Sequence, residues 1–229
     1  DLPWRDTHIQ VEGPVADDFD KLFVATWEKQ GGKPMPASKT VTIEPKGPEV
    51  VRAIAGSPDE AYSHIYATLI SAINSAESTV HLTVAYFVPD PQLVAVLKDA
   101  VARGVDVKLI LPSKTDSGLV FYAARSYYTD LLKGGIKIYE RRDALLHAKT
   151  AVIDGVWSTI GSTNLDWRSF LHNYELNAVV VGDDFGRQME AMFQRDEADS
   201  ELITLEKWKR RSLLDRIKET GSRLWAYWL

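Results

Sequence analysis

The sequence predicts an α/β fold in which helices flank a mixed central sheet. From residue 50 onward, short apolar runs rich in β-branched residues alternate with longer segments of helical periodicity, which is typical of helices layered on a sheet. The pair Asp154-Gly155 joins two of the apolar runs and has the pattern of a tight hairpin turn. We therefore expect an antiparallel pair in a sheet that is otherwise built from strand–helix units.

The first predicted strands alternate with two helices. Val80–Val88 is almost wholly apolar, as in a buried strand, and a proline ends it. Asp90 supplies an N-cap, and the proline after it fits the first turn of a helix over Leu93–Arg103. The next elements are expected to be a strand over Val105–Leu111, a helix over Leu119–Lys133 and a strand over Ile136–Tyr139.

A hairpin and a further strand–helix pair complete the predicted sheet. The hairpin strands Ala148–Ile153 and Trp157–Ile160 flank the Asp-Gly turn. Another apolar strand covers Leu176–Val181, and helical periodicity resumes from about Asp184 to Ala198. Together these elements define a predicted domain at residues 50–204.

The N-terminal part of the chain is predicted to be a separate short piece. Residues 31–49 are rich in glycine and proline and poor in apolar side chains, as expected of an exposed linker. Residues 1–30 are too few to fold alone, yet they repeat a later pattern. Asp6 and Glu175 are each followed seven positions on by a glycine, and each run leads through Asp-Asp-Phe to a helix. We therefore expect residues 1–30 to be the end of a first half that resembles the second.

Composition excludes several kinds of chemistry. The 229 residues include no cysteine, which rules out a disulfide, a thiol nucleophile and cysteine-bound zinc. No apolar run reaches the roughly 20 residues that span a bilayer. None of the usual metal-ligand spacings is present, so neither a metal nor another cofactor is expected.

Charge is distributed unevenly along the chain. The formal net charge is −5, but residues 205–229 carry seven basic and three acidic residues, so this tail is +4 and the remainder is −9. An acidic body repels phosphate backbones, and no nucleic-acid partner is expected.

The tail is basic and amphipathic, with an apolar face formed by Leu213, Leu214, Ile217, Leu224, Trp225 and Trp228. Such a face suits either an anionic membrane surface or docking on its own domain, and the sequence leaves both open.

The residues that carry chemistry follow the spacing His147-x-Lys149-x4-Asp154-x6-Gly161-Ser162-Thr163-Asn164, with Glu175 eleven positions later. On a strand, residues two apart point to the same face, so His147 and Lys149 should lie side by side. A neutral imidazole can attack phosphorus, and a neighbouring lysine would neutralise the phosphoryl oxygens in the transition state. A carboxylate on the far ring nitrogen would fix the imidazole tautomer. Ser162 and Asn164, on a turn, could donate hydrogen bonds to phosphate.

This spacing resembles the signature of the phospholipase D superfamily, H-x-K-x4-D-x6-G-S-x-N, without deviation. Three further stretches are similar to bacterial cardiolipin synthases, namely AYFVPD, RGVDVKLILPSKTDS and NLDWRSFLHNYELN at residues 85–90, 103–117 and 164–177. The resemblance implies the layered phospholipase D-like fold and a two-step phosphatidyl transfer through a phosphohistidine.

The resemblance also implies a role for each residue of the signature. His147 would be the nucleophile or general acid, with Lys149 and Asn164 as phosphate binders. Glu175 would be the acid that orients His147. Asp154 belongs to the same catalytic signature, but its role in the family is more structural than chemical, and an aspartate in a hairpin turn is also favoured for backbone reasons alone.

The chain carries the signature once, whereas enzymes of this family carry it twice and build one site between two halves, with one histidine attacking and the other protonating the leaving group. WRDTHIQVEGP at residues 4–14 resembles the stretch that follows the first copy, so Asp6 would be the acid serving a histidine that this chain lacks. The chain alone is therefore expected to be nearly inactive until the missing half or a second chain completes the site.

For the intact enzyme, the resemblance implies joining of two phosphatidylglycerol molecules into cardiolipin at the bacterial cytoplasmic membrane. Anionic phospholipid and the membrane surface are the expected partners, with attachment through the missing N-terminal part and, in one of the two interpretations above, through the C-terminal tail. Two alternatives stay open. One is a phospholipase D or nuclease of the same superfamily, and the other is a non-catalytic fragment that binds lipid.

Overall fold

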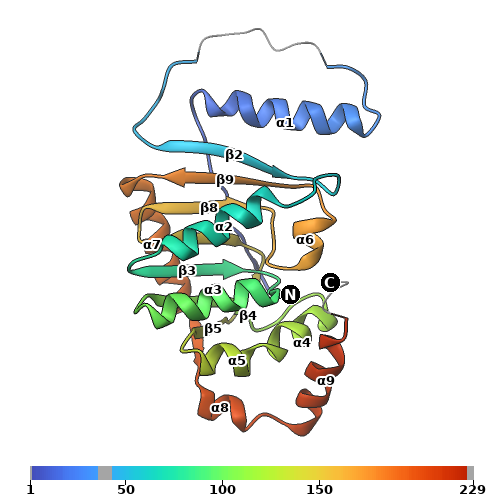
Figure 1. Ribbon diagram of the computed structural model, residues 1–229, viewed down its shortest axis with the longest axis vertical. Helices are drawn as coiled ribbons and strands as arrows, with labels where there is room; N and C mark the ends of the chain where they lie inside the picture. The colour runs from blue at the N-terminus through green and yellow to red at the C-terminus, as the bar shows by residue number, and fades with distance from the viewer. Residues whose placement is uncertain (1, 36–42, 226–229) are drawn as a thin grey trace.

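The computed structural model describes residues 2–35 and 43–225, and an eight-stranded sheet forms its centre (Figure 1). In spatial order the strands are β10 (Ser200–Ile203), β5 (Lys137–Arg141), β4 (Asp106–Pro112), β3 (Thr79–Val84), β7 (Lys149–Ile153), β8 (Trp157–Gly161), β9 (Glu175–Val181) and β2 (Val50–Gly56). The pairs β3–β4 and β4–β5 are parallel, and the other neighbouring pairs of this sheet are antiparallel. The predicted α/β class with a mixed central sheet is thus confirmed.

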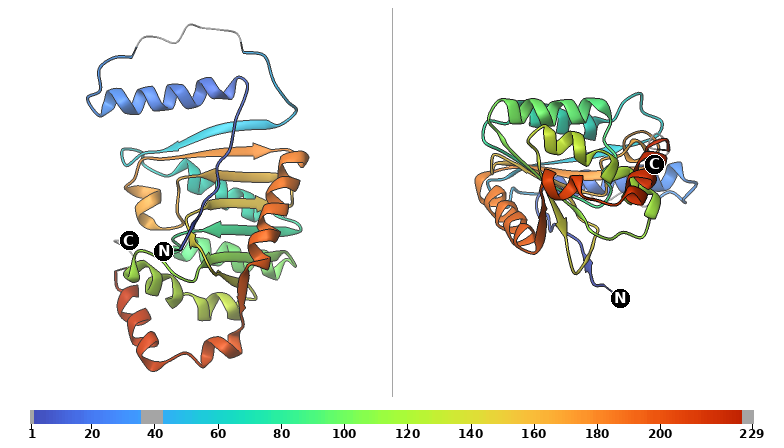
Figure 2. Two further views of the ribbon diagram at one scale, coloured as in Figure 1. Left: turned by 180° about the vertical axis from the view of Figure 1, so that it is seen from behind. Right: turned by 90° about the horizontal axis from the view of Figure 1, so that it is seen from below.

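Helices cover both faces of this sheet. The helices α2 (His64–Ser75), α3 (Pro91–Ala102), α4 (Gly118–Ser126) and α5 (Tyr128–Lys133) lie on one face, and α7 (Asp183–Ala198) lies on the other (Figure 2). The larger part of the core fills the layer between α2, α3 and the sheet, where side chains such as Leu82, Leu97 and Leu109 are fully buried. The short helices α6 (Trp167–Leu171) and α8 (Leu205–Lys209) and the C-terminal α9 (Leu213–Arg223) complete the chain.

Local sequence accounts well for α3 and for the β7–β8 hairpin. The Asp90 side chain accepts a hydrogen bond from the Leu93 amide (3.0 Å), and a proline occupies the first turn of α3. In the hairpin, the Val156 amide donates to the carbonyl of Ile153 (3.1 Å), and both central residues have positive φ. Such a turn requires a residue that tolerates left-handed backbone, which explains the Asp-Gly pair.

The structure departs from the sequence prediction in several elements. The first predicted strand ends at Val84 instead of Val88, because the chain leaves β3 there and the Val88 amide bonds to the carbonyl of Leu165 (2.8 Å). The helix predicted over Leu119–Lys133 is divided into α4 and α5 around Tyr127. The structure adds β2, α2 and β10 to the domain, three elements that were not predicted from the sequence.

The N-terminal segment is tied to the domain by a short parallel strand pair. β1 (Trp4–Arg5) pairs with β6 (Leu145–Leu146). The guanidinium of Arg5 binds the carboxylate of Asp196 on α7 through two hydrogen bonds of 2.7 and 2.5 Å. From there the chain runs along the face of the sheet to α1 (Val15–Lys29), which lies beside the edge strand β2 and buries none of its residues (Figure 2, left).

The predicted linker falls partly on residues 36–42, which lie outside the described residues, as does Trp228 of the tail. Residues 31–35 and 43–49 form neither helix nor strand. In the part of the chain that the structure describes, no helix has both the length and the apolar character needed to cross a membrane.

Candidate active site

Most of the site residues predicted from the sequence gather at one edge of the central sheet. Because β7, β8 and β9 are antiparallel neighbours, the start of β7 at Lys149, the end of β8 at Gly161 and the start of β9 at Glu175 meet at the same edge. His147 lies in the short connection between β6 and β7, not on a strand as predicted, and Asp154 lies at the opposite end of β7.

The imidazole of His147 is held by a carboxylate from the N-terminal segment. Asp6 Oδ2 lies 2.9 Å from His147 Nδ1, and the other carboxylate oxygen of Asp6 accepts a hydrogen bond from the Thr7 amide (2.8 Å). The His147 side chain is 45% exposed and that of Asp6 35%. The indole of Trp4 meets the imidazole edge-on, with ring centroids 5.0 Å apart. The imidazole is therefore oriented on one side and open to solvent on the other.

The partner of His147 differs from the one expected. The resemblance implied Glu175 as its acid and assigned Asp6 to an absent histidine, but the structure places Asp6 on the His147 ring. The reason is the parallel pairing of β1 with β6, in which Arg5 is aligned with Leu146 and its carbonyl accepts from the His147 amide (2.8 Å). Asp6 directly follows β1 and His147 directly follows β6, so the parallel pairing places these two residues next to each other.

Hydrogen bonds and nearby positive charge lower the pKa of Asp6. Partial burial raises the pKa of Asp6, but the hydrogen bonds with His147 and the Thr7 amide and the positive charge of Lys149 outweigh it, so the pKa lies below its ordinary value. The carboxylate is thus ionised at neutral pH and acts only as an acceptor. Nδ1 of His147 must then carry the proton, which leaves the lone pair of a neutral ring on Nε2.

Lys149 is a nearly buried cation beside this pair. Its side chain folds back so that Nζ donates to the carbonyl of His147 (2.6 Å), and the residue is 8% exposed. Burial lowers the pKa of Lys149, opposed by the negative charges of Asp6, Glu175, Asp166 and Asp116. These carboxylates favour the protonated amine, and the N–H groups of Lys149 that do not bond to the His147 carbonyl could donate to a phosphate oxygen.

Glu175 is bonded to the turn that follows β8. Its carboxylate accepts hydrogen bonds from the hydroxyl of Ser162 and from Asn173 Nδ2 (3.1 Å), while the Ser162 hydroxyl accepts from the Leu176 amide (3.0 Å). Glu175 is buried, and no hydrogen bond or ion pair joins it to His147. The structure therefore separates two acids, one on the His147 ring and one on the Gly-Ser-Thr-Asn turn.

The shape of this turn depends on Gly161. A Cβ at position 161 would lie 2.0 Å from Asn177 Oδ1 and 2.4 Å from the carbonyl of Leu176. Further along the turn, the Oδ1 atom of Asn164 accepts from the Tyr86 amide (3.3 Å). This bond orients the side chain, and the NH₂ group of Asn164 remains as a donor for a ligand.

Tyr86 and Asp116 belong to the same edge but were not singled out in the sequence. The Tyr86 hydroxyl donates to Asp116 Oδ1 (2.5 Å). Burial, reinforced by Asp116, raises the pKa of Tyr86 to about 12. The hydrogen bond from Tyr86, opposed by partial burial, lowers the pKa of Asp116, to which His147 contributes electrostatically. Tyr86 comes two residues after the end of β3 and Asp116 four residues after the end of β4, and both lie inside stretches already quoted for the family resemblance.

Asp154 serves the scaffold on the far side of the domain. Its carboxylate accepts hydrogen bonds from the amides of Glu77 (2.9 Å), Ser78 (2.8 Å) and Thr79 (2.8 Å), and its φ is +53°. These bonds connect the β7–β8 turn to the beginning of β3. The geometry is that of a structural residue remote from the imidazole.

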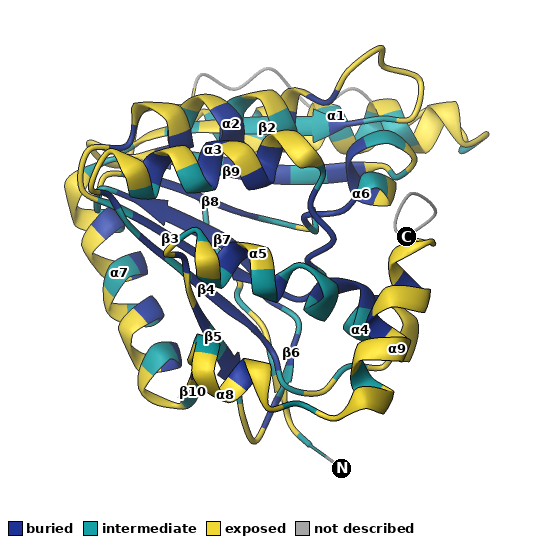
Figure 3. Cartoon of the chain, turned by 60° about the horizontal axis from the view of Figure 1, so that its bottom comes forward, coloured by how far each residue is buried: buried dark blue, intermediate teal, exposed yellow. Residues whose placement is uncertain are grey.

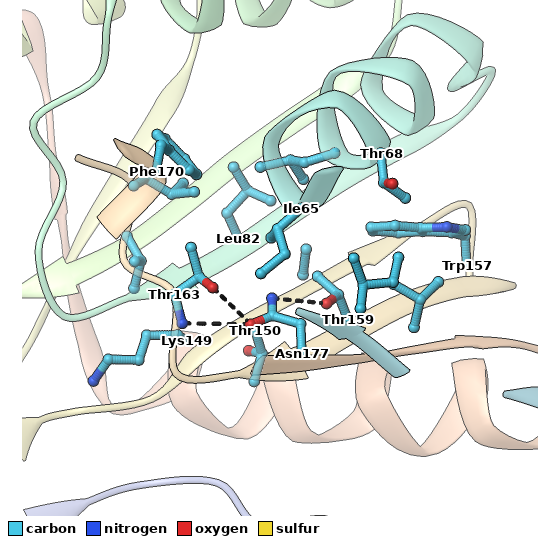
Figure 4. Close-up of a pocket in the computed structure, with 16 residues that line it drawn as sticks. Ile65, Thr68, Leu82, Lys149, Thr150, Trp157, Thr159, Thr163, Phe170 and Asn177 are labelled. Carbon is cyan, nitrogen blue, oxygen red and sulfur yellow. Dashed lines mark hydrogen bonds between the residues drawn. The ribbon is translucent and has the colours of Figure 1, made fainter. Parts of the chain in front are cut away.

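A small cavity of about 30 Å³ lies between α2 and the sheet, next to the site. Its lining is mostly apolar, and three of its polar members are bonded to one another, with Asn177 accepting from Thr163 Oγ1 (2.8 Å) and donating to Thr159 Oγ1 (3.1 Å) (Figure 4). Lys149 also borders the cavity, but its amine points away from it (Figure 4). Such a volume holds about one or two waters and no acyl chain.

Comparison with known proteins agrees with this geometry. Residues 69–197, more than half of the chain, match the protein-family model described as "Cardiolipin synthase, PLD-like domain". The chain is 35% identical to a cardiolipin synthase of Geobacillus sp. (strain WCH70) over 96% of its length and 45% of the relative. It is 34% identical to cardiolipin synthase A of Pectobacterium carotovorum over 94% of its length and 45% of the relative. The chain thus spans less than half the length of these relatives.

Solved structures show the same fold. The phospholipase D family member Nuc from Salmonella typhimurium superposes with a TM-score of 0.58 at 22% identity, covering 69% of this chain and 99% of that protein. Phosphatidylserine synthase from Haemophilus influenzae superposes with a TM-score of 0.62 at 11% identity, covering 94% of this chain and 56% of that protein. These two structures show the fold, and the family match with the curated relatives shows that the chain belongs to the phospholipase D-like domains of the cardiolipin synthase family.

Proposed function

We propose that this chain supplies the second half of a phosphatidyltransferase site in which His147 is the nucleophile, and that the intact enzyme makes cardiolipin from two phosphatidylglycerol molecules. The observation that carries the proposal is the pairing of Asp6 with His147 Nδ1 at 2.9 Å. When the ring is neutral, this contact makes Nε2 the unprotonated nitrogen, on a ring that is open to the surface.

In the first step, Nε2 of His147 attacks the phosphorus of one phosphatidylglycerol. The new N–P bond forms as the P–O bond to the terminal glycerol breaks, and the departing oxygen takes a proton from a general acid. Lys149 and the amide of Asn164 stabilise the phosphoryl oxygens, and Asp6 stabilises the imidazolium that forms. In the second step, the hydroxyl of another phosphatidylglycerol attacks the phosphohistidine, the N–P bond breaks, and the same general acid, now a base, accepts the hydroxyl proton.

The general acid is expected to come from outside this chain. Asp6 and Glu175 occupy equivalent places in the two repeats of the sequence, and Asp6 pairs with the histidine of the opposite half. By the same relation, Glu175 would pair with a histidine of the first half, which this sequence does not contain. Glu175 then becomes the acid that positions the proton donor, and the chain alone lacks that donor. A second copy of this chain could supply the proton donor only if a histidine of that copy reached Glu175.

The test is His147→Ala in the intact enzyme, with phosphatidylglycerol as substrate and cardiolipin measured by thin-layer chromatography. We expect a loss of at least about 10³-fold, as for removal of other covalent nucleophiles. His64→Ala is the matched control, because its ring lies at the surface against Tyr62 and no hydrogen bond or ion pair joins it to Asp6, His147 or Lys149. An unchanged rate in the His147 variant would remove this residue from the chemistry.

Hydrolysis is the second candidate activity, because the exposed face of His147 lets water reach a phosphohistidine there. Phosphatidic acid would then accumulate in place of cardiolipin. The same chromatogram separates the two products, so one assay measures both transfer and hydrolysis. Incubation of the intact enzyme with labelled DNA, run on a gel, tests the nuclease alternative.

A further inference from the structure

The C-terminal helix α9 is attached to the domain by its polar side. Glu219 is only 3% exposed and accepts two hydrogen bonds from Arg211 Nε, at 3.1 and 2.8 Å, and Ser222 is also buried. Arg211 in turn stacks on the indole of Trp208, 4.3 Å from the ring centroid. Successive helical residues are turned by about 100°, so Asp215, Glu219 and Ser222 form one continuous inward face.

The apolar residues of α9 point in the opposite direction. Five large apolar side chains of this segment are 57–82% exposed: Leu213, Leu214, Ile217, Leu224 and Trp225. The outward side of α9 is accordingly coloured as exposed along its length (Figure 3). A surface helix of a globular protein ordinarily buries its apolar stripe. Here that stripe, which we call the outer face of α9, has no partner among the described residues.

Basic residues border the outer face on both sides. Helical geometry places Arg216 and Arg223 on one side of the apolar stripe and Lys218 on the other. Lys218 contacts the hydroxyl of Tyr122 (3.2 Å), and Arg223 lies over the ring of Tyr127. An apolar stripe with cations on both borders and a tryptophan at its end matches the layers of an anionic bilayer surface, with acyl chains beneath and phosphates beside the helix.

The position of α9 relative to the active site agrees with such a contact. α9 packs against α4, which begins two residues after Asp116. Asp116 in turn lies near His147, which contributes electrostatically to the lowered pKa of Asp116. In Figure 1, α9 and the carboxyl ends of β2 and β3 lie on the same side of the molecule. At this edge Leu119, at the start of α4, and Trp4, beside His147, are also exposed.

We infer that the outer face of α9 is a docking surface for a bilayer that contains anionic phospholipid. It would hold the active-site edge at the membrane, where a lipid phosphate can reach His147 without leaving the bilayer. The charge distribution favours this occupant, since the tail carries +4 on a chain whose remainder is −9. The inference adds a membrane surface to the proposed function, but it does not depend on the chemistry of His147.

The experiment is co-sedimentation of this chain with vesicles of phosphatidylcholine alone or mixed equally with phosphatidylglycerol. The wild-type chain is expected to bind the mixed vesicles and to be released by salt. The double variant Leu213→Ser/Ile217→Ser should lose at least about 30-fold in partitioning. Arg216→Gln should weaken binding to the mixed vesicles only. Phe23→Ser, which changes an equally exposed apolar residue on α1, is the control and should bind like wild type.

The altered residues are exposed, so thermal unfolding should be unchanged in each variant, and a loss of binding cannot be attributed to misfolding. Equal vesicle binding by the double variant and wild type would overturn the inference, as would absence of binding by wild type. Solution mass is measured in parallel: a wild-type dimer that the double variant abolishes would assign the outer face to a second copy instead. Failure of His147→Ala to affect transfer would leave the vesicle result intact, so the two proposals fail separately.

Discussion

Replacing Asp6 by asparagine in the intact enzyme tests how the carboxylate acts on His147. The substitution keeps the shape of the side chain but removes its charge, and its amide can turn to donate to Nδ1, which would move the ring proton to Nε2 and block attack. We expect the initial rate of cardiolipin formation to fall, with little change in the amount of folded protein, because Asp6 lies at the surface.

The magnitude follows from the geometry of the pair. Two unit charges about 4 Å apart interact by about 4 kcal/mol at an effective dielectric constant of about 20, and by about 1 kcal/mol in bulk water. The Asp6 and His147 side chains are 35% and 45% exposed, so an intermediate value applies. About 2 kcal/mol of lost imidazolium stabilisation corresponds to about a 30-fold lower rate, and a reversed tautomer would lower it further.

The assay measures cardiolipin formation under initial-rate conditions, together with trapping of the phosphoenzyme from labelled phosphatidylglycerol. Asp6→Asn should reduce phosphoenzyme formation, whereas Glu175→Gln should act mainly on the proton donor of the opposite half. Asp17→Asn, which changes an exposed acid of α1, is the control. A fully active Asp6→Asn enzyme, with Glu175→Gln reducing phosphoenzyme formation at His147, would refute the assignment of Asp6 to this ring.

Three further predictions concern stability, each measured as the free energy of unfolding in urea. Asp154→Ala removes the acceptor of three backbone amides and should cost about 2–4 kcal/mol, with Asp154→Asn less harmful; equal stability of the alanine variant would contradict the scaffold role. Gly161→Ala forces a Cβ against Asn177 and should cost about 1–3 kcal/mol, whereas Gly118→Ala, where nothing lies within 4 Å, should be neutral or slightly stabilising. Burial raises the pKa of Asp166 to about 6. Because the folded state then binds the proton more tightly than the unfolded chain, this group should reduce stability by roughly 2–3 kcal/mol as pH rises from about 4 to above 6. Asp166→Asn keeps an N-cap on α6 and should remove that slope; a slope identical to wild type would show that another group causes it.

The parts of the fold that sequence analysis identified depend on local signals. The cap at Asp90, the Asp-Gly turn and the apolar run at β4 each specify an element within a dozen residues. Two of the elements that were missed, the strands β2 and β10, have weak local signals, since β2 is an edge strand with several half-exposed residues and β10 has only four residues. Their formation depends on pairing with β9 and β5, which the local sequence does not reveal.

In the candidate site too, the contacts predicted from the sequence are those between residues near each other in the chain. The spacing of the signature brought Lys149, Ser162 and Glu175 to one edge because the hairpin and the strand after it are contiguous in sequence. The acid on His147 could not be assigned in this way, since Asp6 is 141 positions away in the sequence. Only the three-dimensional pairing of two two-residue strands determines which of the two equivalent acids reaches this imidazole.

The β1–β6 pairing also determines where the two halves of the intact protein can be divided. Residues 31–49 look like the natural division between the repeats, yet the carboxylate that contacts His147 belongs to the segment ahead of them. A pair of co-expressed polypeptides split within that stretch would leave Asp6 on one molecule and His147 on the other, so that activity would require the exchange of a strand only two residues long. A split placed before Trp4 would keep acid and imidazole in one polypeptide.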